Sequence, residues 1–110
     1  MRIHTIIISL AIILFPLATI AGAGHSHGPL SQGNAELAAI KNVAGLVEKG
    51  KIEKSWKTIG VLKSEKKNFG NGTEWVISFK NEKISDASKQ TLYIFMTLEG
   101  RFLAANYTGK

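Results

Sequence analysis

Two histidines near the N-terminal end, His25 and His27, are the side chains of this sequence best suited to hold a metal ion. Neutral imidazoles bind Cu(II), Ni(II) and Zn(II). Cleavage after Ala23 would let the new α-amine, the His25 amide nitrogen and the His25 imidazole chelate Cu(II), with His27 as a further ligand. Cleavage after Gly22 would place His25 third, a spacing that also chelates Cu(II) and Ni(II). We keep a site for Cu(II) or another divalent metal as one hypothesis, and a polar spacer without metal as its alternative.

From Ser31 onward the sequence is poorly equipped for catalysis, because it contains no histidine and no cysteine. Nucleophilic catalysis by Ser or Cys usually needs a histidine as base, and acid–base catalysis near neutral pH most often uses one as well. Carboxylates remain, and a pair of them could hydrolyse a glycoside. A chain of 110 residues leaves little room for a deep substrate cleft. We therefore expect a protein that is not an enzyme and has no cofactor besides the metal considered above.

A second chemical feature is the aromatic pair Tyr93 and Phe95, which alternates with Leu92, Ile94 and Met96. In a strand, successive side chains point to opposite faces of the sheet. If a helix covers the aliphatic face, the two rings stay partly exposed on the other face and could bind a peptide or an envelope protein. The alternative is that they belong to the core. Rings between lysines also suit single-stranded nucleic acid, but an export signal argues against that, and we expect no nucleic-acid partner.

The export signal lies in the first 23 residues. A short positive segment, Met1–Thr5, precedes an almost wholly apolar run, Ile6–Ile20, and Ala21-Gly22-Ala23 provides a small-x-small cleavage pattern. The alternative is an uncleaved membrane anchor, because the apolar stretch is about long enough to cross a bilayer. We expect membrane contact only during export, and a mature protein in the periplasm or outside the cell. The expected organisation is a signal-peptide helix at 1–23, a flexible leader at 24–30 and one domain at 31–110.

The domain is predicted to be α+β. Apolar residues at Ile40, Val43, Ala44 and Val47 repeat at helical spacing, and Ser31 can cap the start of that helix. After one further helical turn, the pattern changes to strand-like alternation separated by turn signals. We expect one main helix packed on a four-stranded antiparallel meander, because the sheet has one strongly apolar face to cover. The expected elements are a helix over 32–49, a turn containing Ile52 and Trp56, and strands over 58–69, 75–79, 92–98 and 101–107.

This order of elements resembles PepSY-type (PepSY/cystatin-like) domains of bacterial envelope and secreted proteins. The segments that carry the resemblance are Leu30-Ser31-Gln32, 74–79 and 98–102. A closer resemblance is to a family of short uncharacterised proteobacterial exported proteins, on 25–29, Trp56, 74–76, 89–93 and 104–110. PepSY domains are thought to act as protease-inhibiting or chaperone-like binding modules. The resemblance therefore implies a fold and an envelope location, and the closer family brings no known activity.

The charge is the last sequence feature that bears on function. The chain carries a formal net charge of +6 and a pI near 9.7. Such a balance favours anionic partners, or serves solubility alone. We expect Lys63, Lys66 and Lys67 to form a solvated strand edge that discourages aggregation. The sequence thus predicts a monomeric, non-enzymatic exported binding module, and alternatively a metal-binding envelope protein that uses the His-x-His leader.

Overall fold

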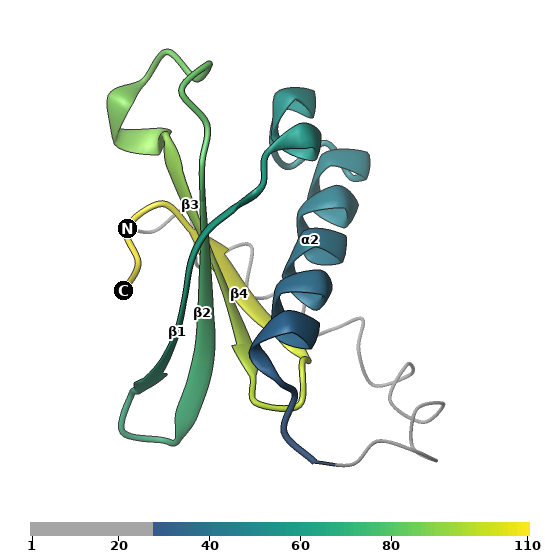
Figure 1. Ribbon diagram of the computed structural model, residues 1–110. Coiled ribbons are helices and arrows are strands. Elements are labelled where there is room, and N and C mark those ends of the chain that lie inside the picture. The colour runs from purple at the N-terminus through teal and green to yellow at the C-terminus, as the bar shows by residue number, and fades with distance from the viewer. Residues whose placement is uncertain (1–27) are drawn as a thin grey trace.

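The computed structural model describes residues 28–110. In this part of the chain a single long helix packs against one face of a four-stranded antiparallel sheet (Figure 1). The strands lie in the order β1-β2-β3-β4, so each pairs with its neighbour in sequence. The predicted α+β meander is therefore confirmed. The elements are α2 (Gln32–Glu48), η1 (Lys54–Thr58), β1 (Val61–Asn68), β2 (Thr73–Lys80), η2 (Ala87–Lys89), β3 (Thr91–Thr97) and β4 (Phe102–Asn106).

Helix α2 begins and ends close to the predicted positions, but its buried stripe differs. The Ser31 Oγ accepts a hydrogen bond from the Asn34 N–H at 3.2 Å, which caps the helix start. The stripe predicted through Ile40 is wrong in that residue, since the Ile40 side chain is 42% exposed. Alanines take its place in the core, since Ala35 and Ala39 are fully buried. The buried residues of α2 are Ala35, Ala39, Val43 and Leu46.

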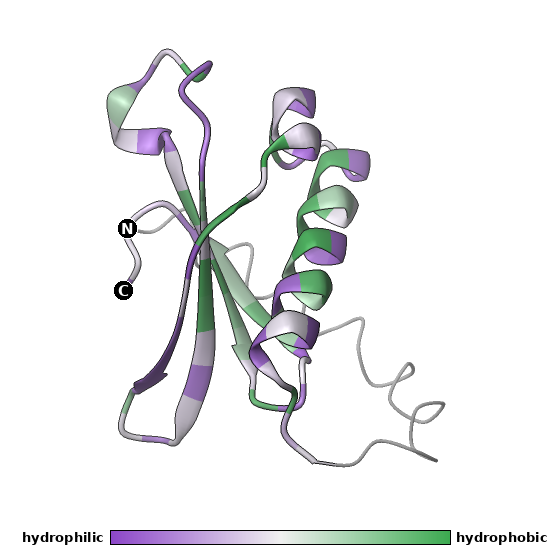
Figure 2. Ribbon diagram, in the orientation of Figure 1, coloured by the Kyte–Doolittle hydropathy of each residue, from purple (hydrophilic) through white to green (hydrophobic). Residues whose placement is uncertain are grey.

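The core lies between α2 and the inner face of the sheet. Alternation in β2 places Trp75, Ile77 and Phe79 on this face, each at most 4% exposed. The register pairs Ile77 with Ile94 and Phe79 with Leu92, so the neighbouring strand contributes its aliphatic residues to the same layer. Figure 2 shows hydrophobic residues along the central part of β2 and along α2. Burial of these side chains contributes roughly 2 kcal/mol each to folding.

A short 3-10 helix closes one end of the core. The predicted helical turn near Trp56 is η1, and the Trp56 side chain is 1% exposed within the core cluster. Because η1 extends to Thr58, the first strand begins at Val61 and not at Thr58. The β2–β3 connection is held to η1 by Asn81, which is fully buried and donates from Nδ2 to the Ser55 Oγ at 2.9 Å. This end of the molecule is therefore tied together by a polar contact as well as by packing.

The N-terminal end of the described chain is also part of the fold. The Leu30 backbone N–H donates to the Leu98 carbonyl at 2.8 Å, and the Leu30 side chain packs against the core. It lies beside Gly100 in the β3–β4 turn, where φ is +96°. A glycine suits this position because an L side chain rarely adopts such a φ and because a Cβ would meet Leu30. The domain thus includes Leu30, which the sequence assigned to the leader.

Candidate functional site

The predicted metal ligands, His25 and His27, lie outside the described residues, so metal binding by the leader stays a prediction. Within residues 28–110 no three His, Cys, Asp or Glu side chains are grouped so that they could hold a metal ion. The same residues include no helix that is long and apolar enough to cross a membrane. The candidate sites of the described domain are therefore surfaces and hollows without a metal-binding cluster.

The second predicted site, at Tyr93 and Phe95, differs from expectation. Both residues lie on the sheet face away from α2, as predicted, but the Phe95 side chain is only 5% exposed. The Phe69 ring packs edge-on against the Phe95 ring, with their centroids 5.9 Å apart. The Tyr93 ring lies next to Gly109, where an added Cβ would come within 3.0 Å of it. The chain's own hairpin end and C-terminal tail thus occupy much of the area expected to receive a ligand.

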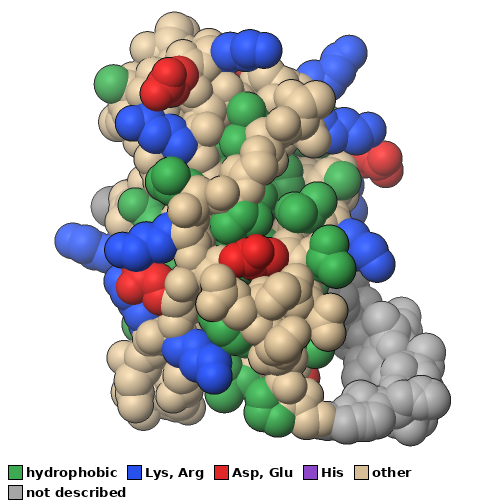
Figure 3. All heavy atoms as spheres, viewed as in Figure 1, with side chains coloured by type: hydrophobic (Ala, Val, Ile, Leu, Met, Phe, Trp, Pro, Cys, Tyr) green, Lys and Arg blue, Asp and Glu red, His purple; other side chains and the backbone are tan. Residues whose placement is uncertain are grey.

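A better-developed surface lies on the opposite side of the molecule, along the seam between α2 and β1. We call it the α2–β1 face. In Figure 3 apolar side chains line the middle of this face, an acidic side chain lies among them, and basic side chains surround them. The residues that define it are Glu36, Leu37, Ile40 and Lys41 of α2, Lys57 of η1, and Ser64 and Lys66 of β1.

The apolar part of this face comes from α2. Leu37 is 58% exposed and Ile40 is 42% exposed. Residues three and four apart are neighbours on a helix surface, so Ile40 lies beside Leu37 and on the same side of α2 as Glu36. Helix surfaces that turn away from the core are usually polar. Two large aliphatic side chains exposed together on this side of α2 therefore mark a surface that a partner could cover.

Glu36 is held in place at the seam by two neutral donors. The Ser64 hydroxyl donates to the Glu36 Oε2 at 2.5 Å and the Gln32 Nε2 donates to the same oxygen at 3.1 Å. These hydrogen bonds, the one from Ser64 above all, lower the pKa of the Glu36 carboxyl, so it is ionised at neutral pH. Among the described residues the Glu36 Oε1 accepts no hydrogen bond. A ligand with a donor group could therefore bind this oxygen.

A hollow of about 440 Å³ lies at the end of the seam nearest the start of α2. Trp75 lies in its wall and is 4% exposed. The Lys66 Nζ lies over the Trp75 ring, 5.2 Å from its centroid, a cation–π contact that contributes about 0.5–1 kcal/mol at an exposed site. The contact orients Lys66 toward the seam. The residues that line the hollow are Leu30, Ser31, Gln32, Ser64, Glu65, Lys66 and Trp75.

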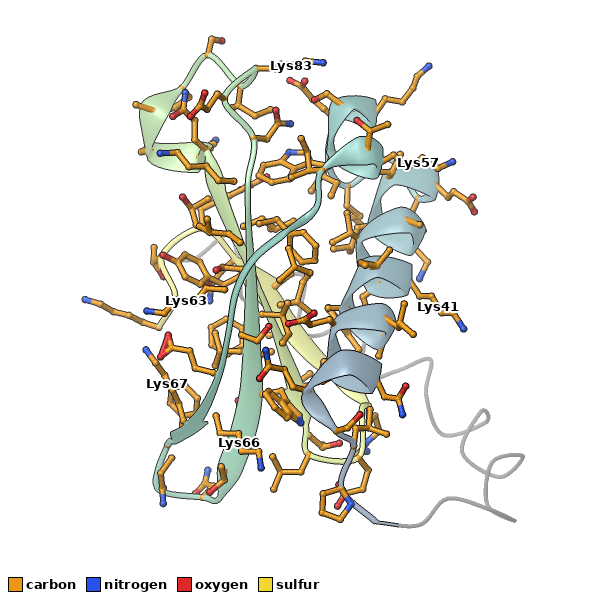
Figure 4. The ribbon with its side chains drawn as sticks, viewed as in Figure 1. Lys41, Lys57, Lys63, Lys66, Lys67 and Lys83 are labelled. Atoms are coloured by element: carbon orange, nitrogen blue, oxygen red, sulfur yellow. The ribbon has the colours of Figure 1, made fainter. Side chains whose placement is uncertain are left out.

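Three lysines stand around the α2–β1 face. Figure 4 shows Lys66 beside the seam on β1, whereas Lys41 and Lys57 project outward on the side of α2 away from β1, and Lys63 and Lys67 extend from the far side of β1. Within the described part of the chain the one ion pair joins the Lys63 Nζ to Glu65 at 3.5 Å. Lys41, Lys57 and Lys66 are therefore not neutralised by any described carboxylate. Lys66 was expected to be a purely solvated edge residue, and its contact with Trp75 is an addition to that expectation.

A smaller hollow, of about 220 Å³, lies between the β1–β2 turn and the β3–β4 turn. Glu74 and Glu99 both line it. Burial raises the pKa of the Glu74 carboxyl, and no described cation is within ion-pair distance of it. Among the described residues no third His, Cys, Asp or Glu side chain joins these two carboxylates, so the hollow offers little for catalysis or for binding a metal. The α2–β1 face remains the stronger candidate.

The fold and this face define a small α+β domain, one helix on a four-stranded meander, with a basic and apolar seam. A family of unknown function, DUF6488, matches residues 1–110, and the chain belongs to this family. This confirms the expectation of a family without an assigned activity. No curated protein and no solved structure matches the chain significantly. The PepSY resemblance therefore stays a prediction.

Proposed function

We propose that the chain is a non-enzymatic exported binding module, acting in the periplasm or outside the cell as a monomer, and that the α2–β1 face receives a peptide segment of another envelope protein. The observation that carries this proposal is the exposed pair Leu37 and Ile40 next to Glu36, whose Oε1 has no described hydrogen-bond partner. Apolar area provides affinity, and a fixed acceptor provides orientation. A peptide offers both complements, because it carries aliphatic side chains and backbone N–H donors.

The chemistry of the chain supports binding over turnover. From Ser31 onward it has no histidine or cysteine, so a nucleophile would lack its usual base. The two hollows described above are open and small. The apolar run at residues 6–20 and the small residues after it support export. No nucleic-acid partner is proposed, since the features of an export signal argue against one, and Trp75 and Phe95 are too buried to stack on bases.

The test begins with the protein as cells process it. The full chain is expressed with its N-terminus intact, the periplasmic fraction is purified, and intact mass with N-terminal sequencing gives the mature start. We expect cleavage at or next to Ala23. Full-length protein in the cytosol would refute the export part of the proposal.

The binding part is tested on the same purified protein. A random peptide library displayed on phage is selected against it, and the enriched peptides are titrated while backbone amide shifts are followed by NMR. We expect saturable binding with shifts at Glu36, Ile40 and Ser64. An Ile40→Asp variant should lose this binding, and an outer-face variant, Thr91→Asp, should keep it. Shifts confined to Tyr93 and its neighbours would place the site on the other sheet face.

The second candidate function is metal handling by the leader, which the His25-x-His27 spacing favours. Neutral imidazoles next to a new α-amine suit Cu(II). Isothermal titration of the processed protein with Cu(II) should show one site that a His25→Ala variant loses, and a His4→Ala precursor should yield a mature protein that keeps it. Absence of heat of binding from the correctly processed protein would dismiss this candidate.

A further inference from the structure

We propose that the peptide bound by the α2–β1 face is an acidic one with aliphatic side chains, an inference that rests on the proposed function above. The first ground is the charge around the seam. Lys41, Lys57 and Lys66 come from three different elements and flank the α2–β1 face, Lys66 on its β1 side and the other two on its α2 side (Figure 4). None is paired with a described carboxylate. Unpaired charges of one sign on one surface raise the local concentration of ligands of the opposite sign.

The second ground is the apolar centre of the same surface. Leu37 and Ile40 are exposed between the lysines of the rim. A ligand that carried acidic groups alone would leave these side chains in water, and an apolar ligand would leave the lysines unpaired. A segment in which acidic and aliphatic residues are mixed satisfies both, with the aliphatic side chains on α2 and the carboxylates on the rim.

The third ground is Glu36, which excludes two other polyanions. It is ionised and lies inside the lysine rim, where a phosphate-rich surface would place negative charge directly against it. The headgroup layer of an anionic bilayer is such a surface. A single-stranded nucleic acid would need an exposed ring, and Trp75 is 4% exposed. A peptide can place a backbone N–H on the Glu36 Oε1 and keep its carboxylates at the rim.

The experiment uses the processed protein and two labelled probe peptides, one of alternating Glu and Leu and one of alternating Lys and Leu, of equal length and with blocked ends. Fluorescence anisotropy gives their affinities at low and high NaCl concentration. We expect saturable binding of the acidic probe, at least tenfold weaker binding of the basic probe, and a loss of affinity for the acidic probe as salt rises.

A matched pair of variants locates the effect. Lys41→Gln, Lys57→Gln and Lys66→Gln together should weaken binding of the acidic probe by about tenfold, because each exposed ion pair contributes a few-fold. The control, with the same change of net charge, replaces Lys80, Lys89 and Lys110 by Gln and should change the affinity less than twofold. Lys80 lies at the end of β2, Lys89 at the end of η2, and Lys110 is the last residue. Circular dichroism melts of both variants show that each is folded.

Four outcomes would overturn the inference. If both probes bind equally, the face takes peptides without regard to charge, and the proposed function stands without the inference. If the control variant loses as much affinity as the rim variant, net charge alone attracts the probe. If the rim variant loses binding to phosphatidylglycerol vesicles but not to the acidic probe, the rim serves a lipid surface. If neither probe binds, the inference fails, and the library selection decides separately whether any peptide binds.

Discussion

Replacing Gly100 by Ala should destabilise the domain more than the same change at Gly50, because only Gly100 has a neighbour in the way. Both glycines have a positive φ, +96° at Gly100 and +72° at Gly50. An alanine held in a left-handed conformation costs roughly 1–2 kcal/mol. At Gly50 nothing lies within 4 Å of the added Cβ, whereas at Gly100 it would lie 2.6 Å from the Leu30 Cδ1.

The difference between the two variants reports the packing of Leu30. That side chain can rotate away, and the loss of part of its apolar contact costs about 1 kcal/mol. We therefore expect Gly50→Ala to lower the free energy of unfolding by about 1–2 kcal/mol and Gly100→Ala by about 2–3 kcal/mol. The effect of alanine on the unfolded chain is the same in both variants and cancels in the comparison.

The assay is urea unfolding followed by tryptophan fluorescence, extended to a double-mutant cycle with Leu30→Ala. A domain of this size has a stability of roughly 4–12 kcal/mol, so each variant should remain folded in water. Leu30→Ala should cost about 1 kcal/mol less in the Gly100→Ala background than in the wild type. Equal destabilisation by the two glycine substitutions, together with additive effects in the cycle, would refute the contact between Leu30 and the β3–β4 turn.

Three further predictions concern polar contacts. Hydrogen bonds lower the pKa of Glu36 below its ordinary 4.5, so they stabilise the fold above that pH and lose this effect as the pH falls through the lowered pKa. The urea midpoint of the wild type should therefore fall more between about pH 6 and about pH 3 than that of Glu36→Gln; parallel curves would contradict this. Ser31→Ala, which removes the cap of α2, should cost about 1 kcal/mol in a thermal melt, and the exposed control Ser85→Ala less than about 0.5 kcal/mol. Asn81→Ala leaves the Lys83 N–H without its acceptor and should cost about 2 kcal/mol by urea unfolding, with faster amide exchange in the β2–β3 connection; unchanged exchange there would argue against the tie to η1.

The sheet could be predicted from the sequence because the apolar residues of its inner face recur at every second position of the strands. Trp75, Ile77 and Phe79 repeat every second residue, and so do the aliphatic residues of β3. Glycine-containing turns separate β1 from β2 and β3 from β4, and a polar loop without glycine, residues 81–90, separates β2 from β3. The order of the four strands follows from these local signals alone, which is why the fold class was predictable.

The helix face was less predictable because the large side chains do not define it. Ile40 is the larger residue, yet Ala35 and Ala39 are the ones fully buried. A prediction based on the largest apolar side chains places the buried stripe of α2 around Ile40. The buried side of the helix is then predicted at the wrong angle about the helix axis. Which side of α2 contacts the sheet depends on the assembled fold, and that side carries the two alanines.

The candidate site could not be predicted because its parts are distant in sequence. Glu36 and Ser64 are separated by 28 positions, and nothing in the local pattern of β1 indicates that Ser64 faces the helix. The contact of Lys66 with Trp75 depends on the β1–β2 register, which pairs these two residues directly. Alternation alone predicts a partly exposed Phe95, and its burial could not be predicted because the Phe69 ring that packs against it comes from the β1–β2 turn.

The placement of the ionisable groups has a consequence for how the domain responds to its surroundings. All three histidines precede residue 28 and the chain has no cysteine, so residues 28–110 contain neither of the two side-chain types that most often change charge near neutral pH. The charges of the α2–β1 face come from lysines and from Glu36, whose carboxyl has a lowered pKa and stays ionised around neutrality. Dissolved ions act differently, because the reach of these charges shrinks from about 30 Å at 0.01 M salt to about 10 Å at 0.1 M. Salinity, and not proton concentration, is the variable of a natural medium to which this surface is sensitive.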